Sequence, residues 1–475
     1  MMGQENDCKR KLFYYSTSLD KRIRSDHPLR KISKNIDFDF IYEEVKDTYG
    51  TRGNVSVPPP VILKMLLLLI LYNVRSEREL MITIPERLDW MWFLGYDLDD
   101  NVPNHSVLSK ARKRWGVDAF RSFFERIVHQ CVTAGLVDGH KIFLDSSLVQ
   151  ANASNNSVVK TDSVERYLDQ GFIELEKRLD DVQEKSGVVN RKYVSTTDPD
   201  ASAIRKGAGV SKLQYQTHRA VEGKNEIITA TMVTPGEVNE AHCLKPLIED
   251  HIAHTHHQVQ TVVADSKYGT VENFLHCHDL GIAAHIPDLM EGQKKQKRRA
   301  EIFSEEDFTY DPFADVYRCP ANHILKRRIF NKARQAGEYK CPKKICNACE
   351  LRDQCTKSSN GRTVKRHQRH EELQSMRQRA QTKKGKKDIK LRQSLMERSF
   401  ARSTRYGYKR ARWRNTWRVQ IQEYLTATVQ NIMVMIRKIG NMPKAIAHKA
   451  VVETYQDIFM QTWRKNCSLI TQLHN

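Results

Sequence analysis

Residues 258–269 read QVQTVVADSKYG, and residues 141–147 read KIFLDSS. Each stretch is a short apolar run followed directly by an aspartate, Asp265 in the first and Asp145 in the second. Short apolar runs of this kind indicate buried strands. Side chains at the carboxyl ends of such strands project into the crevice where α/β proteins carry out their chemistry. The two stretches therefore predict an α/β sheet with acids at two of its strand ends.

The segments around these strands complete a mixed sheet. We expect further strands at 216–221, 226–234 and 282–286, and helices at 238–251 and 271–280. Three strands followed by helix, strand, helix and strand are typical of a mixed α/β sheet. Between the first two strands, residues 162–186 have a charged amphipathic helical pattern and residues 188–210 are loop-like.

The N-terminal part of the chain is helical in pattern. Four helices are expected. The first covers 61–74, the second begins at a capping box formed by Ser76 and Glu79, the third begins near residue 104, and the fourth covers 117–134. The helix near 104 is basic, which is compatible with a helix-turn-helix-like DNA contact. A plain helical domain for packing or dimerisation explains the pattern equally well.

The charge of the chain indicates a polyanionic partner. The 475 residues carry a formal net charge of +21, and residues 361–420 alone contain 20 Lys or Arg and four acids. No apolar run approaches the roughly 20 residues that span a bilayer, and no secretion signal is visible. We therefore expect a cytoplasmic protein whose partner is nucleic acid.

Aromatic residues are interleaved with the basic residues near the end of this region. Arginine and lysine neutralise phosphates, and planar rings stack on bases. The segment from Arg398 to Arg418 is therefore interpreted as a DNA-binding face, whereas Lys383–Lys387 alone is read as a solvated basic linker. The candidate DNA-binding residues are Arg392, Arg398, Arg402, Arg405, Lys409, Arg410, Arg412, Trp413 and Arg414.

Two close carboxylates repel one another unless a cation lies between them. Mg²⁺ or Mn²⁺ suits such oxygen ligands, and a pair of these ions stabilises both oxygens of an in-line phosphoryl displacement. The alternative is that Asp145 and Asp265 simply cap turns, as most strand-end aspartates do. Spacing alone does not separate the two readings.

Five of the ten cysteines lie within 37 residues, at 319, 341, 346, 349 and 355. Thiolates with a CxxC spacing suit tetrahedral Zn²⁺. The expected ligands are Cys319, Cys346, Cys349 and Cys355, with Cys341 the spare and His323 and His367 possible substitutes. Unligated cysteines remain the alternative.

Four histidines, at 251, 254, 256 and 257, form another concentration near the expected end of a helix. We interpret them as surface residues that interact with the helix dipole, although a second metal site is not excluded.

Three blocks of the sequence together resemble a known family. Phe143–Ser147 (FLDSS), Val263–Gly269 (VADSKYG) and Met396–Phe400 (MERSF) look like the three acidic blocks of the DDE transposases of bacterial insertion sequences. Residues 195–201 (STTDPDA) and the region around 58–80 also look like that family. The likeness covers most of residues 40–440 and is closest to the insertion-sequence-1182-like branch.

The resemblance implies an RNase H-like catalytic fold that binds two Mg²⁺ or Mn²⁺ ions through Asp145, Asp265 and Glu397. It also implies cleavage and strand transfer of DNA, with terminal inverted repeats and target DNA as partners and at least a homodimer in the synaptic complex. Such a protein would act in the bacterial cytoplasm, at the nucleoid. Arg392 resembles a family arginine. Thr404 stands where the family commonly has lysine, so Arg402 or Arg405 is expected to make that contact.

The expected organisation has five parts. A helical DNA-binding or dimerisation domain (1–138) precedes the first part of the RNase H-like core (139–287). A basic insertion with the cysteine cluster (288–388) precedes the completion of the core (389–440) and a tail (441–475). Two alternatives remain open: a DNA-binding protein without catalysis, derived from a transposase, and an RNase H-like nuclease.

Overall fold

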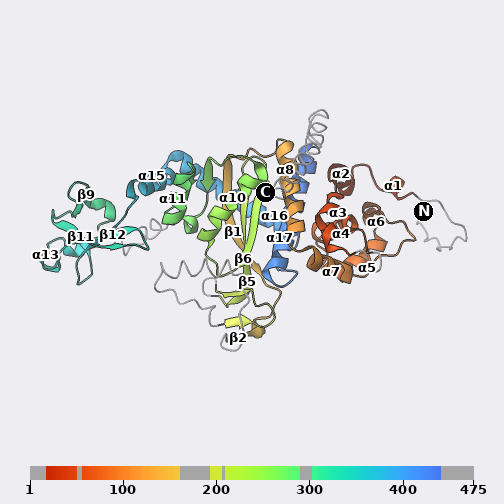
Figure 1. The fold of residues 1–475 in the computed structure, drawn as a ribbon, viewed down its shortest axis with the longest axis horizontal. Helices are drawn as coiled ribbons and strands as arrows, with labels where there is room; N and C mark the ends of the chain where they lie inside the picture. The colour runs from red at the N-terminus through yellow and green to blue at the C-terminus, as the bar shows by residue number, and fades with distance from the viewer. Residues whose placement is uncertain (1–17, 51–55, 161–192, 206–208, 289–301, 440–475) are drawn as a thin grey trace, which may run out of the picture.

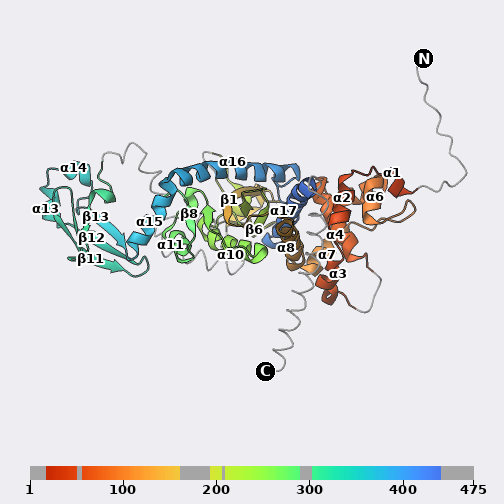
Figure 2. The same cartoon turned by 90° about the horizontal axis from the view of Figure 1, so that it is seen from above.

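The computed structural model describes residues 18–50, 56–160, 193–205, 209–288 and 302–439 (Figure 1). The helical pattern expected at 162–186 and the tail at 441–475 lie outside the described residues. The described chain is elongated. Figures 1 and 2 show the N-terminal helices at one end, a mixed sheet in the middle and a second sheet at the other end.

Eight helices form the described N-terminal part: α1 (Leu19–Arg22), α2 (Pro28–Asn35), α3 (Phe40–Val45), α4 (Pro59–Leu71), α5 (Glu77–Thr83), α6 (Leu88–Leu94), α7 (Ser106–Trp115) and α8 (Asp118–Thr133). Helix α4 is apolar on almost every side and is buried at the centre of this group. The hydroxyl of Ser76 accepts a hydrogen bond of 3.1 Å from the backbone N–H of Glu79, so the predicted start of α5 is confirmed.

The central sheet consists of β1 (Lys141–Gln150), β4 (Ser202–Ile204), β5 (Lys212–Glu222), β6 (Ile228–Pro235), β7 (Thr261–Val263) and β8 (Ala283–His285). Strand β5 pairs antiparallel with β1 and β6, while β7 pairs parallel with β1 and β8. Strand β4 pairs with the first residues of β5. The mixed sheet expected from the sequence is therefore present, with the expected order of strands and helices along the chain.

Helices cover both faces of this sheet (Figure 2). Ile142 and Leu144 pack in one hydrophobic cluster with α10 (Leu244–Thr255) and α11 (Val271–Asp279). Phe143 packs in another cluster with α8 and with α16 (Lys383–Arg405) and α17 (Thr416–Ile439). The alternation of β1 side chains thus separates an α10 face from an α16 face. Because the second cluster also contains the N-terminal helices, that region and the sheet share one core.

The segment expected to be a basic linker, Lys383–Lys387, is instead the first turn of α16. The hydroxyl of Thr382 accepts a hydrogen bond of 3.0 Å from the N–H of Gly385, which caps the helix. Gly385 lies against the carbonyl oxygens of Arg379 and Ala380, where a side chain would not fit. The composition of this stretch is that of a solvated loop, but the cap and the close packing make it helical.

The STTDPDA segment serves the far end of the chain. The Asp198 and Asp200 carboxylates accept hydrogen bonds of 3.0 and 2.8 Å from the backbone N–H groups of Asn415 and Thr416. These N–H groups belong to the start of α17, where backbone donors have no partner within the helix. The segment therefore fixes the beginning of α17 against the sheet.

The second sheet has the strand order β13-β12-β11-β10-β9 and is antiparallel. Its elements are β9 (Thr309–Asp311), β10 (Val316–Arg318), β11 (Ile324–Asn331), β12 (Ala336–Lys340), α13 (Lys343–Asn347), α14 (Arg352–Cys355) and β13 (Thr363–His367). Helix α15 (His370–Gln381) then packs on the central core through Leu373 and Met376. The chain thus returns to the central sheet before residue 389. A small separate ladder joins β2 (Val158–Lys160) to β3 (Tyr193–Ser195).

Candidate active site

Asp145 and Asp265 lie side by side just beyond the point where the parallel ladder of β1 and β7 ends. The parallel pairing of β1 with β7 sets Lys141 opposite Thr261 and Phe143 opposite Val263. Each aspartate comes two residues after the last of these pairs, so the register brings both to the same level. Adjacent strands are about 4.8 Å apart. The predicted meeting of two acids is therefore supported by the strand register.

The end of β1 was not predicted correctly. The strand was expected to stop at Asp145, but it continues to Gln150 because residues 146–150 remain paired with β5. Only the parallel ladder with β7 ends before Asp145. The aspartate therefore lies within a strand, at the point where one of its two neighbours departs.

Asp145 faces α16. Its Oδ2 accepts a hydrogen bond of 2.5 Å from Nη1 of Arg392, and its Oδ1 accepts one of 2.8 Å from the N–H of Ser146. Burial raises the pKa of Asp145 to about 6, although Arg392 opposes the rise. The negative charges of Asp265 and Glu240 add to it. A carboxyl group with this pKa is costly to ionise without a cation beside it.

Asp265 begins a short turn at residues 266–268. Its side chain accepts a hydrogen bond of 2.9 Å from the N–H of Lys267. Burial raises the pKa of this carboxyl, and the charge of Glu240 raises it further. Asp265 thus fulfils the turn-capping role of a strand-end aspartate and also belongs to an acid cluster.

The charge of Glu240 acts on both aspartates, and this residue was not predicted from the sequence. It lies in the turn Glu240–Cys243 before α10, and only 6% of its surface is exposed. Nε2 of Gln216 donates to its Oε1 at 2.6 Å, and the Lys267 ammonium forms an ion pair with it. Nothing in its spacing marks it, since an acid in the first turn of a helix is ordinary.

Glu397 lies on α16, five residues after Arg392, and its side chain is exposed. Five residues turn a helix by about 140°, so the two side chains point in different directions from the helix. In the described residues, the one hydrogen bond to the Glu397 side chain comes from Gln393, at 3.3 Å. The strand register thus brings Asp145 and Asp265 together, and the α16 residue that contacts Asp145 is Arg392.

Several candidate DNA-binding residues have partners within the chain. Arg392 is bound to Asp145, and Arg398 and Arg402 both pair with Glu226. Arg414 donates to the carbonyl of Asn152 at 3.1 Å. The exposed candidates are Arg398, Arg405, Lys409, Arg410 and Arg414. Within the described part of the chain, no hydrogen bond or ion pair involves the side chain of Arg405, Lys409 or Arg410.

Arg412 and Trp413 join the C-terminal part to the N-terminal helices. Arg412 donates to Oδ1 of Asn73 at 2.8 Å and to the carbonyl of Val74. The indole of Trp413 donates to Glu77 at 3.0 Å, and the Arg112 guanidinium lies 3.9 Å from its ring centroid. Arg112 is itself buried and paired with Glu77. These side chains form an internal interface between the C-terminal part and the N-terminal helices. The basic composition of the two parts does not predict it.

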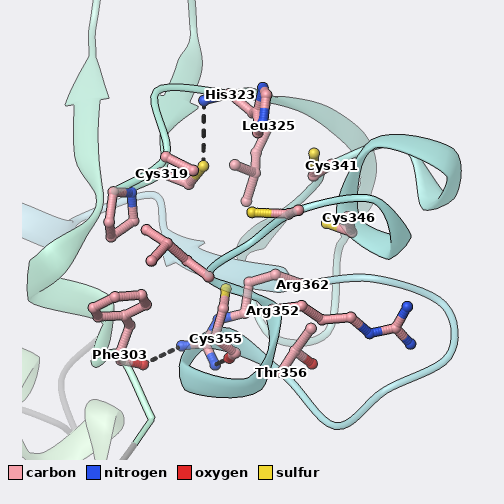
Figure 3. A pocket seen from close by; sticks show the side chains of 14 residues that line it. Phe303, Cys319, His323, Leu325, Cys341, Cys346, Arg352, Cys355, Thr356 and Arg362 are labelled. Atoms are coloured by element: carbon pink, nitrogen blue, oxygen red, sulfur yellow. Dashed lines mark hydrogen bonds between the residues drawn. The ribbon is translucent and has the colours of Figure 1, made fainter.

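The five cysteines of the second sheet line one pocket (Figure 3). Burial raises the pKa of the Cys341 thiol to about 12, and its neighbour Cys346 adds to the rise. Cys319, Cys346 and Cys349 influence the pKa of both Cys341 and Cys355. His323 is also in the pocket, whereas His367 lies on β13 and accepts a backbone hydrogen bond from Arg369.

The thiols are gathered but are not at ligand spacing. Among the described residues, one group of three possible ligands has its atoms within 4.8 Å of one another, namely His278, Asp279 and Glu372. The Arg369 guanidinium is bound to both acids of that group, so a cation of the chain already occupies it.

The interpretation of the histidines as surface residues was wrong for two of them. His251 is fully buried, with Nδ1 2.6 Å from the Thr229 hydroxyl and Nε2 3.0 Å from the Gly139 carbonyl. Burial lowers the pKa of His251 to about 4, so it is neutral at pH 7. His254 reaches the Thr229 carbonyl at 2.7 Å. Both histidines connect α10 to β6, because each contacts Thr229.

Two family models match the chain. Residues 17–114 match a model described as Transposase domain (DUF772), and residues 318–436 match one described as Transposase DDE domain. Comparison with curated proteins and with solved structures found no match. The two family matches support a DDE transposase. They cover Glu397 and the cysteines, while Asp145 and Asp265 lie between them.

Among the described residues, no helix combines the length and the apolar character that crossing a membrane requires.

Proposed function

We propose that the chain is a metal-dependent DNA transposase of the DDE type, with an RNase H-like core. The observation that carries this proposal is the acid pair, Asp145 and Asp265, which the register of β1 and β7 sets side by side. The two transposase family matches on either side of the pair support it. The insertion-sequence-1182-like branch is the specific family we propose.

The acid pair fits divalent cations. Both carboxyl groups are buried enough that burial is the largest cause of their raised pKa, and each lies within the field of other acids. Oxygen ligands of this kind suit Mg²⁺ or Mn²⁺. We propose Asp145, Asp265 and Glu397 as the ligands of two ions, which would activate an attacking hydroxyl and neutralise charge on the phosphate. Among the described residues the three carboxylates are not within ligand reach of one another, so ion binding would have to bring Glu397 to the acid pair.

Two displacements at phosphorus make up the proposed reaction. Water first attacks a phosphodiester at the end of the element, and the bond from phosphorus to the 3′ oxygen breaks. The freed 3′-hydroxyl then attacks a phosphodiester of target DNA and expels a second 3′-hydroxyl. Both steps are in-line displacements of the same kind, so one site serves both. Two ends must meet, so the active form is at least a homodimer.

Arg392 has a defined place in this proposal. Its guanidinium, bound to Asp145, balances the negative charge of the acid pair while no cation is bound. DNA phosphates would be held by the exposed Arg405, Lys409, Arg410 and Arg414 and by the N-terminal helices. Arg405 is the exposed arginine next to Thr404, and it would supply the contact expected of a lysine there.

We further propose a structural Zn²⁺ in the second sheet, held by Cys319, Cys346, Cys349 and Cys355. The residues fit such an ion by chemistry, because these four thiols, together with that of Cys341, line one pocket and thiolates are preferred zinc ligands. Zinc binding would draw the sulfur atoms together.

The experiment that tests the activity uses a supercoiled plasmid that carries the gene with its natural flanking DNA. With Mg²⁺, the purified protein should nick at the ends of the element and join them to a target. Asp145→Asn and Asp265→Asn should each lower both rates by at least a thousandfold, while Asp279→Asn on the exposed surface should not. Equal nicking by wild type and both variants would contradict the proposal.

The same experiment decides between the proposal and its alternatives. A protein derived from a transposase but without catalysis would bind the end DNA and leave it intact. Arg392 on Asp145 and Thr404 in place of lysine are the features that favour this alternative. A nuclease of the same fold would cut DNA without special ends and join nothing.

A further inference from the structure

We propose that one face of the second sheet is a DNA-binding surface, which holds phosphates of duplex DNA through Arg318, Lys326 and Lys340. This inference rests on the proposed function and deepens it, because it adds a contact to the same partner. None of the candidate DNA-binding residues named above lies in the second sheet, so the surface is a separate one.

The buried residues of the second sheet lie on one of its two faces. Tyr317 is opposite Leu325 in the strand register, and Tyr339 is opposite Val364. These four side chains are buried in one hydrophobic cluster, against which cysteines of the pocket pack. Successive side chains of a strand point to opposite faces. The residues between the buried ones therefore point away from the cluster, and we call the side to which they point the outer face.

The outer face is open to solvent. Arg318, Ile324 and Lys326 are exposed on it, and Ile329 is 63% exposed. Strand β11 is the central strand of the five, yet residues 326–330 are all exposed. In Figures 1 and 2 the second sheet extends beyond α15, away from the central sheet. Within the described part of the chain, nothing covers this face.

Two lysines of the outer face lie directly opposite one another. The register pairs Lys326 on β11 with Lys340 on β12. Arg318 lies on the same face of β10, two residues from Val316, the other partner of Lys326. Like charges at directly opposite positions destabilise a sheet. Among the described residues, no hydrogen bond or ion pair involves the side chain of any of these three cations. Such an arrangement indicates a ligand that supplies the negative charge.

The acids on the outer face of these strands already have partners. Glu338 pairs with Lys365 on the neighbouring strand at 3.1 Å. Oδ1 of Asp311 accepts hydrogen bonds of 3.1 and 3.2 Å from the N–H groups of Phe313 and Ala314, which fixes the turn after β9. The charges of Arg318, Lys326 and Lys340 are therefore not balanced from within the face.

The charge of the outer face favours DNA over a second copy of the chain. Two copies that met through this face would bring the same cations together, and like charges at an interface oppose association. Phosphates of a duplex carry the complementary charge. The exposed Ile324 and Ile329 would lie against the sugars. Contacts to phosphate and sugar position a protein on DNA without reading its sequence, so this contact should be independent of sequence.

The experiment measures binding of the full chain to a duplex with the end of the element and to an unrelated duplex of equal length. Electrophoretic shifts across a salt series, in EDTA, give the affinities. Lys326→Gln/Lys340→Gln should weaken binding to both duplexes about tenfold and lower the slope of log affinity against log salt by about 2. The melting temperature should not fall, because the change removes a pair of like charges.

Lys343→Gln/Lys344→Gln is the matched control. Both lysines are exposed on α13, the helix that carries Cys346 of the cysteine pocket, and they do not belong to the outer face. The control removes the same charge from the same part of the chain. It should leave the salt slope unchanged.

Three outcomes overturn the inference. An unchanged affinity and slope for Lys326→Gln/Lys340→Gln shows that the outer face does not hold DNA. An equal loss in the control shows that net charge, and not this face, determines binding. A third outcome is that Ile324→Ser/Ile329→Ser turns a dimer into a monomer in sedimentation while DNA affinity is unchanged. The face then pairs two copies of the chain.

The inference and the proposed function fail in different ways, because binding in EDTA requires no catalysis. If wild type and Asp145→Asn nick DNA equally while Lys326→Gln/Lys340→Gln lowers the salt slope, the proposed activity is lost and the surface stands. If Asp145→Asn abolishes nicking while the double lysine variant binds as wild type does, the proposed function stands and only the surface is lost.

Discussion

The carboxyl group of Asp145 destabilises the folded protein when it is ionised, because it is buried. Its pKa of about 6 lies above the value of 3.8 for an exposed aspartate, mainly because the carboxyl group is buried. A folded-state pKa that is raised in this way stabilises the protein below pH 3.8. The stabilisation is lost as the pH rises through 6. At neutral pH the ionised carboxylate therefore lowers the free energy of unfolding.

The first prediction concerns the effect of Asp145 on the free energy of unfolding. In metal-free buffer at pH 7.5, Asp145→Asn should raise the free energy of unfolding by about 1 to 3 kcal/mol, the order set by a shift of about two pKa units. The gain should shrink as the pH falls from 6 toward 4, because the wild-type carboxyl group becomes neutral. Urea unfolding at both pH values measures it. A variant less stable than wild type at pH 7.5 would contradict the account.

At the residue scale, the sequence was informative where an acid follows an apolar run. Asp145 and Asp265 were identified for that reason, and the register of β1 and β7 supports the prediction. Glu240 was missed because its partners, Gln216 and Lys267, come from distant segments. His251 was misread because a polar side chain near a helix end indicates the surface unless its buried partners are known.

Helices α16 and α17 are fastened to the sheet by a buried ion pair. Arg219 lies opposite Asp145 on β5, and its Nε and Nη2 lie 2.6 and 2.8 Å from the two oxygens of Glu423 on α17. Its Nη1 donates to the hydroxyl of Ser403 on α16 at 2.7 Å. One arginine therefore positions both helices, and with them Arg392 and Glu397.

The second prediction concerns this pair. Both side chains are 0% exposed, so Arg219→Met leaves an uncompensated buried carboxylate and should cost about 3–5 kcal/mol. The double variant Arg219→Met/Glu423→Leu should recover most of that loss. Urea unfolding checks both. The exposed pair Lys245–Glu249 is the control, where Lys245→Ala should cost less than about 1 kcal/mol. Equal losses at the two pairs would refute the role assigned to Arg219.

At the element scale, the strands and helices of the central sheet were predictable because their apolar periods are clear. The extension of β1 beyond Asp145 was not, since Ser146 and Ser147 are polar and their pairing with β5 is a long-range property. The internal contacts of Arg412 and Trp413 could not be predicted from the sequence either. Composition predicts a cationic surface, whereas the contacts with Asn73, Val74 and Glu77 depend on how distant helices meet.

In the molecule as a whole, some basic residues of the C-terminal part make contacts within the chain, and others face the solvent. The third prediction uses this division. Arg405→Ala/Arg410→Ala should weaken binding to end DNA and lower the slope of log affinity against log salt by about 2, one for each lost phosphate contact. Thermal stability should not change. Electrophoretic shifts across a salt series measure the slope.

Arg412→Ala is the matched variant for this measurement. It should lower the melting temperature, because it breaks the contacts with Asn73 and Val74, and should leave the salt slope unchanged. The reverse pattern, with a changed slope for Arg412→Ala and none for the double variant, would show that the DNA-binding face lies elsewhere.

The fourth prediction concerns the second sheet, at one end of the elongated molecule (Figure 1). The purified chain should contain about one zinc ion. Cys349→Ser and Cys355→Ser should lose it, and residues 302–369 should then become sensitive to protease. Cys341→Ser should retain zinc, because the other four cysteines suffice. Metal analysis of the variants decides, and zinc loss in Cys341→Ser with retention in Cys355→Ser would reverse the assigned ligands.

The most direct test of the central claim is the anomalous scattering of Mn²⁺ in crystals of the full chain with end DNA. We expect Mn²⁺ peaks at ligand distance from the carboxylates of Asp145 and Asp265, with Glu397 completing the site. Crystals of Asp265→Asn should lack the peaks. Mn²⁺ bound only elsewhere, for example at Asp279 and Glu372, with both aspartates free of metal, would contradict the account.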